Sequence, residues 1–169
     1  AGVVKGLETL RAVQAEAAKG LPWYNPSLPA ADKNNKKPGS RPAFLMHAMS
    51  LGLPVPASIK KDDPEMLAWV AKYGKDHPFI QARLTYASVT PHIARLESML
   101  ALMDKDGILR YSTKYFGCHT GRASGKGEEA GSGEDNDTKW NFYNQAKGDK
   151  DTGLTHGVNM RGLITPRPG

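Results

Sequence analysis

The chain has little cysteine and no long apolar run. Its 169 residues contain a single cysteine, Cys118, which excludes an internal disulfide framework and a cysteine-rich zinc site. No run of eighteen apolar residues occurs, and residues 1–5 lack the charged-then-apolar order of a secretory signal. These absences predict a soluble protein without a membrane partner, located in the reducing cytoplasm.

Spacings typical of metal or nucleophile sites are also missing. The five histidines never have the HExxH spacing of zinc peptidases. Asp104 and Asp106 begin like a calcium loop, but the later oxygen ligands and the closing glutamate are absent, so a tight turn at Gly107 is predicted. Cys118 and His119 are neighbours in an extended segment, where adjacent side chains point to opposite faces. No metal ligand and no catalytic residue is therefore assigned to the chain.

Basic residues are in excess in the first part of the chain. Residues 1–103 hold 13 Lys and Arg against 8 Asp and Glu, whereas residues 104–169 hold 10 against 9. Residues 21–41 are rich in Pro, Asn, Lys and Gly, which predicts an exposed loop. Its clustered cations are Lys33, Lys36, Lys37 and Arg41. Two interpretations stay open, a solvated loop or a surface that follows the phosphates of a duplex.

Apolar residues recur at helical spacing through the first 103 residues. Glycine, proline and capping residues divide this pattern into four predicted helices, over residues 3–19, residues 41–51, Asp62 or Asp63 to Gly74, and residues 76–103. Pro91 lies inside the last helix. Because proline removes one backbone donor and crowds the preceding turn, we expect a kink or a break near residues 88–90.

The composition changes after Gly107. Residues 108–116 are rich in β-branched and aromatic residues and are bounded by glycine, which predicts a strand. Residues 125–139 hold four glycines and five acids, with Ala130 as the one apolar residue, which predicts a mobile acidic loop. The expected fold class is therefore α+β, with a helical part over residues 1–103 and a β-rich part over residues 104–169.

Three blocks in the second part resemble one enzyme family. They are Lys114–Gly125 with the sequence KYFGCHTGRASG, Asn141–Asn144 with the sequence NFYN, and Arg161–Ile164 with the sequence RGLI. In this order they resemble the segment of family A DNA polymerases, particularly phage-type ones, that grips primer and template ahead of the first catalytic aspartate. The resemblance covers roughly residues 51–169 and is strongest from Asp106 onward.

The resemblance implies that Arg122 contacts the primer terminus and the nascent base pair in the minor groove. Thr120 and Gly121 would shape the backbone around it. Residue chemistry is compatible with this role, because every base pair presents a minor-groove acceptor and arginine offers a planar fork of donors. On residue types alone, a glycine-rich strand turn with surface polar groups is the alternative.

Four further residues are expected to bind DNA. Asn141 and Asn144 match amides that hold the template or primer backbone, contacts that set register rather than sequence. Arg161 matches the basic residue ahead of the catalytic strand, and Arg83 lies in a segment similar to the thumb, whose paired helices follow the minor groove.

The same resemblance implies chemistry that residues 1–169 do not contain. The family transfers nucleotides with two Mg²⁺ ions held by carboxylates of later motifs, and it binds the deoxynucleotide on a further helix. The chain is therefore expected to be the thumb and first palm segment of a template-directed DNA polymerase, whether a fragment or one subunit of a two-piece, phage-encoded enzyme in the host cytoplasm. It is expected to need a second polypeptide with the rest of palm and fingers. A non-catalytic nucleic-acid-binding module and a protein-interaction domain remain as alternatives.

Overall fold

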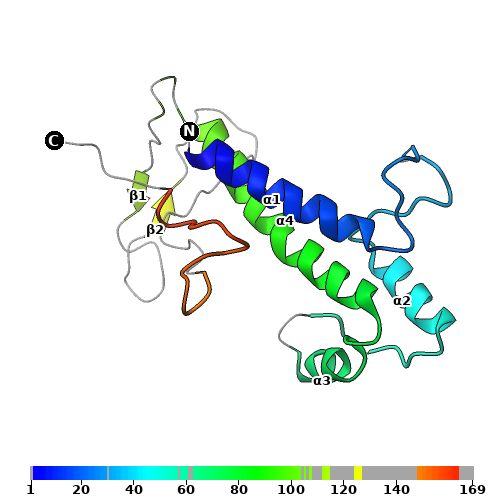
Figure 1. Cartoon of the computed structure of the whole chain (residues 1–169). Coiled ribbons are helices and arrows are strands. Elements are labelled where there is room, and N and C mark those ends of the chain that lie inside the picture. The colour runs from blue at the N-terminus through cyan, green and yellow to red at the C-terminus, as the bar shows by residue number, and fades with distance from the viewer. Residues whose placement is uncertain are drawn as a thin grey trace. The chain divides into compact units, whose positions relative to one another are not determined.

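A computed structural model describes residues 2–29, 31–56, 58–60, 63–103, 105, 107, 112–114, 124–126 and 148–163. Figure 1 shows the helices and strands found in these residues. They are α1 (Gly2–Lys19), α2 (Arg41–Ser50), α3 (Pro64–Tyr73), α4 (Pro78–Leu102), β1 (Ser112–Lys114) and β2 (Ser124–Lys126). Contacts group the chain into unit 1, residues 1–11 and 91–169, and unit 2, residues 12–90. The division of the chain at residue 103 stays a prediction.

The expectation of an α+β fold with a β-rich second part is wrong. The described residues are mainly helical, since the four helices have 18, 10, 10 and 25 residues and the two strands have three each. β1 and β2 pair antiparallel, with Thr113 opposite Gly125. The rest of the predicted strand 108–116, and residues 127–139 of the predicted acidic loop, lie outside the described residues.

Residues 148–163 form turns because their sequence favours turns over strands. The glycines at 148, 153 and 157 have φ values of 77°, 65° and 82°, a region that glycine occupies without strain. Asp149 accepts hydrogen bonds from the backbone N–H groups of Asp151 (3.0 Å) and Thr152 (3.2 Å), which closes an Asx turn. These backbone hydrogen bonds hold the pKa of Asp149 below its usual value.

Local signals at α2 and α3 act as predicted. The Ser40 hydroxyl accepts a hydrogen bond from the N–H of Ala43 (3.3 Å), and the Asp63 carboxylate accepts one from the N–H of Glu65 (3.0 Å). Both side chains thus satisfy backbone donors that have no partner inside the helix. α2 ends at Ser50, and Gly52 beyond it has a φ of 70°, which lets the N–H of Leu53 return to the Ala48 carbonyl.

α4 continues without interruption through residues 88–90, so of the expected kink or break the break does not occur. Pro91 itself is exposed, whereas Val89 and Ile93 on either side of it are buried. Burial of these two side chains favours a continuous helix and offsets the loss of one backbone hydrogen bond at the proline. Among the described helices, none is both long enough and apolar enough to cross a bilayer.

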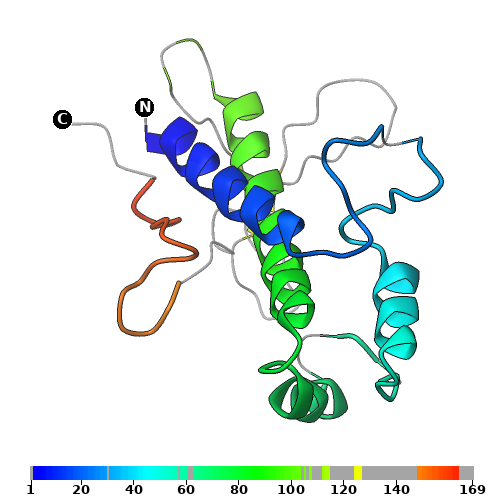
Figure 2. The same cartoon turned by 45° about the vertical axis from the view of Figure 1, so that its right-hand side comes forward.

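In unit 2, the end of α1 runs antiparallel to the beginning of α4 (Figures 1 and 2). The amide of Gln14 donates to the Thr90 hydroxyl (3.0 Å), and a Cβ on Gly20 would lie only 2.9 Å from the Cβ of Ala82. The helices therefore approach closely where α1 ends.

The hydrophobic core of unit 2 is built around aromatic rings from α2, α3 and α4. Phe44 contacts Trp69 and Phe79 with ring centroids 5.9 and 5.8 Å apart, distances at which tilted and edge-to-face pairs are favourable. The indole N–H of Trp69 donates to the Pro54 carbonyl (2.6 Å). The buried residues of this aromatic core are Phe44, Ala48, Met66, Trp69, Phe79 and Ile80.

Unit 1 has a core of its own, in which the beginning of α1 and the end of α4 meet residues 148–163. A Cβ on Gly6 would lie 3.1 Å from Val158 and 3.4 Å from Leu96, so the glycine leaves room for Val158 against α1. The buried hydrophobic residues of this unit are Val3, Leu7, Leu10, Ile93, Leu96, Met99, Val158 and Met160.

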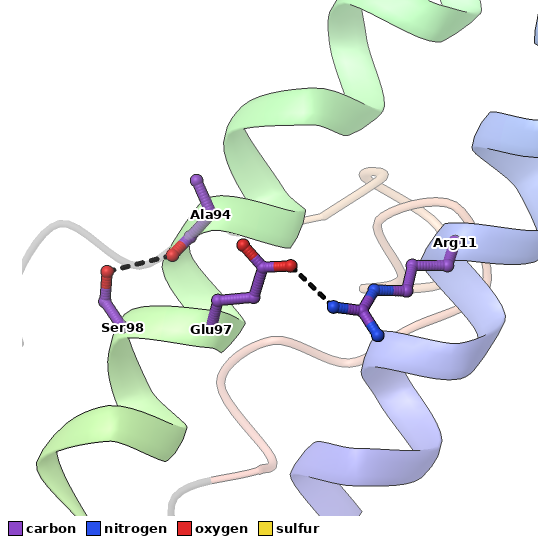
Figure 3. Close-up of polar contacts among 4 residues, drawn as sticks. All are labelled: Arg11, Ala94, Glu97 and Ser98. Atoms are coloured by element: carbon purple, nitrogen blue, oxygen red, sulfur yellow. Dashed lines mark hydrogen bonds and ion pairs between the residues drawn. The ribbon is translucent and has the colours of Figure 1, made fainter. Parts of the chain in front are cut away.

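An exposed ion pair also joins the two helices in unit 1. Figure 3 shows Arg11 of α1 donating to the Glu97 carboxylate of α4, at 2.7 Å. The side chains are 58% and 48% exposed, so solvent screens the pair and it stabilises the fold by at most about 1 kcal/mol. Close packing at Gly6 is therefore the larger restraint on α1 in this unit.

Candidate nucleic-acid interface

The basic loop, residues 21–41, is an ordered segment although its residues before Arg41 form no helix or strand. Asn35 lies at its centre and is only 9% exposed. Its side-chain oxygen accepts a hydrogen bond from the N–H of Asn25 (2.9 Å), and its amide nitrogen donates to the carbonyls of Asn25 and Leu28 (both 3.0 Å). One buried side chain thus replaces the backbone pairing that a helix or strand would supply.

Trp23 connects the basic loop to the aromatic core. Its indole N–H donates to the Pro38 carbonyl (3.3 Å), and its own carbonyl accepts from the N–H of Lys36 (2.9 Å). Its ring meets Phe44 and Phe79 edge-on, at centroid distances of 6.1 and 6.2 Å. Trp23 therefore links the beginning of the loop to its end, at Lys36 and Pro38, and packs on the core.

A second attachment comes from α4. The Arg83 guanidinium donates from Nη2 to the Gly39 carbonyl (2.9 Å), and its Nε is buried with no hydrogen-bond partner among the described residues. Burial lowers the pKa of Arg83, although a guanidinium stays protonated in proteins. Tyr86, one turn further along α4, lies where a Cβ on Gly39 would be 3.8 Å from its ring.

The Tyr86 phenol belongs to the same attachment. Burial raises its pKa above the usual tyrosine value, the nearby Tyr24 phenol raises it further, and the positive charge of Arg83 lowers it. Arg83 and Tyr86 of α4 thus lie beside Gly39 of the loop, and Tyr24 lies near Tyr86.

The four loop cations, Lys33, Lys36, Lys37 and Arg41, all have exposed side chains. The Lys36 ammonium donates to the backbone carbonyl of Lys33 (2.5 Å). The single acid of the loop, Asp32, accepts from the N–H of Asn34 (2.8 Å). Within the part of the chain that the structure describes, the ion pairs are Arg11–Glu97 and Lys19–Glu16, so no carboxylate neutralises the loop cations. Their charge can attract a polyanion.

Of the other residues expected to bind DNA, the structure describes only Arg161. Arg161 is exposed in unit 1 and follows the buried Met160, in a turn where the Asn159 side chain accepts from the N–H of Gly162 (2.8 Å). Five residues expected to bind DNA lie outside the described ranges, namely Thr120, Gly121, Arg122, Asn141 and Asn144. Their roles stay predictions.

The sequence analysis missed the residues that shape the loop. Asn35 sits in a run of polar residues, so nothing local distinguished it from its exposed neighbour Asn34. A usable signal came from Trp23 and Tyr24, because two aromatic residues in a polar loop indicate that the loop packs against something. Arg83 was expected to contact DNA, and the structure places it against the loop backbone.

Metal binding and similarity to known proteins complete the description of the interface. Among the described residues, no group of three His, Cys, Asp or Glu side chains could hold a metal ion. The chain matches no protein-family model, no curated protein and no solved structure. The residues and the geometry of the loop are therefore the basis for inferring a function.

Proposed function

We propose that the chain is part of a template-directed DNA polymerase of family A, in which it binds primer–template DNA during nucleotidyl transfer. The observation that carries the proposal is the basic loop, where four exposed cations are held on an ordered backbone and form no ion pair with a carboxylate of the described residues. The occurrence of the three polymerase-like blocks in the same order as in the family supports it. Residues outside 1–169 would bind Mg²⁺ and the deoxynucleotide.

The loop suits a contact with phosphates rather than with bases. Lysine is a point charge on a long stem, which attracts phosphate without reading sequence, and backbone contacts set the register of a protein on a duplex. Because the loop is ordered by Asn35 and Trp23, little conformational entropy is lost when DNA binds. Arg122, Asn141 and Asn144 are proposed to act nearer the primer terminus, and Arg161 to support them.

Salt dependence of binding to a primer–template duplex tests the proposal. Replacing Lys33, Lys36 and Lys37 together by alanine should reduce the slope of log affinity against log salt by about 2.7, or about 0.9 for each phosphate contact. The matched control replaces Lys60, Lys72 and Lys75, three exposed lysines elsewhere in unit 2, and should reduce it by less than about 0.9. Equal losses in both variants would indicate general charge attraction and contradict the proposed interface.

An extension assay separates a polymerase from a non-catalytic DNA-binding module. In Mg²⁺ and deoxynucleotides, residues 1–169 alone should extend no primer, and addition of the remaining palm and fingers should start extension. DNA binding without any extension in the combined protein would favour the non-catalytic module. Binding that is independent of salt would favour the protein-interaction domain.

A further inference from the structure

Arg83 reaches from α4 to one particular position of the basic loop. Its Nη2 donates to the carbonyl of Gly39 at 2.9 Å. Gly39 lies between two of the loop cations, Lys37 and Arg41, and directly before Ser40, which caps α2. A restraint at Gly39 therefore restrains the loop where its cations join the helix.

The side chain is poorly placed to bind a phosphate itself. Arginine usually grips phosphate with two parallel N–H donors. In Arg83, Nη2 is already engaged with Gly39, and Nε is buried below the surface. Two of its three nitrogens are thus directed to the protein. The guanidinium is therefore already hydrogen-bonded to the loop in the absence of DNA.

Neighbouring groups favour this arrangement. The Tyr86 ring lies against Gly39 on one side, and Trp23 donates to the Pro38 carbonyl on the other. Consecutive residues near the end of the loop are thus held by side chains of α4 and by Trp23 from the beginning of the loop. Without Arg83, the Trp23 contact would remain, but the segment that leads to Arg41 would lose its one hydrogen bond to α4 among the described residues.

We propose that Arg83 is a positioning residue, which latches Gly39 and thereby holds Lys33, Lys36, Lys37 and Arg41 in the arrangement that binds duplex phosphates. The latch itself rests on the geometry alone, and its effect on DNA rests on the proposed function. Arg83 acts through the loop cations and makes no contact with DNA.

Proteolysis without DNA tests the latch. Trypsin cuts after exposed lysines once the backbone around them opens, so Arg83→Ala should be cleaved after Lys33 and Lys36 several-fold faster than the parent chain. Arg83→Lys should recover part of the resistance, because an ammonium can also donate to a carbonyl. Lys37→Ala serves as the matched control, since it removes one charge and no hydrogen bond of the loop. Unchanged cleavage in Arg83→Ala, with the helix signal in circular dichroism retained, would overturn the latch.

DNA binding at several salt concentrations tests what the latch does. Lys37→Ala should reduce the salt slope by about 0.9, the value of one phosphate contact. Arg83→Ala should reduce it by about 1.8 or more, because several cations lose their arrangement together. In the double variant, the reduction of the salt slope should be smaller than the sum of the reductions in the two single variants. A loss of about 0.9 that adds fully to that of Lys37→Ala would show that Arg83 binds a phosphate itself.

The two experiments fail in different ways. If the parent chain binds no DNA but Arg83→Ala still opens the loop to trypsin, the proposed function is wrong and the latch stands. If the parent binds DNA with the expected salt dependence and Arg83→Ala changes neither cleavage nor slope, the latch is wrong and the function stands.

Discussion

Replacing Asn35 should open the basic loop from its centre. Alanine at this position removes three hydrogen bonds of 2.9–3.0 Å, two to carbonyls and one from a backbone N–H, and a longer one of 3.4 Å to the Pro29 carbonyl. Each is worth about 1 kcal/mol net, and part of the loss is recovered when water reaches the freed groups, so Asn35→Ala should lower the free energy of unfolding by about 2–3 kcal/mol. This is a large share of the stability of a small domain.

Urea unfolding followed by circular dichroism measures this effect. The matched control is Asn34→Ala, which changes the same residue type at the adjacent, exposed position and should cost less than about 0.5 kcal/mol. Asn35→Asp should cost more than Asn35→Ala, because it turns a carboxylate oxygen toward two carbonyls. That carboxyl should have a raised pKa in the folded chain, so part of the loss should disappear as the pH falls toward about 5. Equal stability of Asn35→Ala and Asn34→Ala would refute the reasoning.

Three other predictions concern the base of the loop, unit 1 and the primer terminus. The raised pKa of Tyr86 favours its neutral form in the fold, so this stabilisation is present below about pH 10 and is lost as the pH rises through the folded pKa. In urea unfolding from pH 9 to about 11, Tyr86→Phe should therefore lose less stability with rising pH than the parent chain. An unchanged pH profile would contradict the burial of the phenol. Gly6→Leu should destabilise the chain by about 2 kcal/mol, because even a Cβ would lie 3.1 Å from Val158. The control Glu8→Leu, at an exposed position of α1, should change the stability little. Thermal unfolding compares the two variants, and equal effects would argue against close packing at Gly6. In the complete enzyme, Arg122→Ala should slow primer extension by on the order of 100-fold with a much smaller loss of DNA affinity, since a misplaced primer terminus reacts slowly. Arg122→Lys should restore little of the rate, because an ammonium lacks the planar fork of donors. An affinity loss as large as the rate loss would place Arg122 away from the primer terminus.

The sequence was sufficient where the cause of a structure lies within a few residues. Caps at Ser40 and Asp63, together with helical spacing of apolar residues, predicted the beginnings of α2 and α3 because a cap acts on backbone donors two or three residues away. The exposed cations of the basic loop were also predictable, since a cluster of lysines rarely finds enough carboxylates to be buried.

Prediction failed where distant contacts decide the outcome. The burial of Asn35 depends on carbonyls up to ten residues away, and the orientation of Arg83 depends on a loop 44 residues earlier in the chain. The β-rich expectation for residues 104–169 extended the strand signal of residues 108–116 to the whole part, whereas glycines and Asp149 close turns in residues 148–163. Of the kink or break expected near residues 88–90, the break does not occur, because the burial of Val89 and Ile93 against packed partners favours a continuous helix.

Trp23 packs on the same rings that hold α2, α3 and α4 together, so the loop can be no better ordered than that core. A destabilising change such as Phe44→Ala would leave only a fraction of molecules with a formed loop, and the apparent dissociation constant rises as the inverse of that fraction. The molecules that do bind would still neutralise the same number of phosphates. Affinity would therefore fall at every salt concentration while the salt slope stayed constant, which distinguishes a change that unfolds the loop in a fraction of the molecules from one that removes phosphate contacts in every molecule, as Arg83→Ala should.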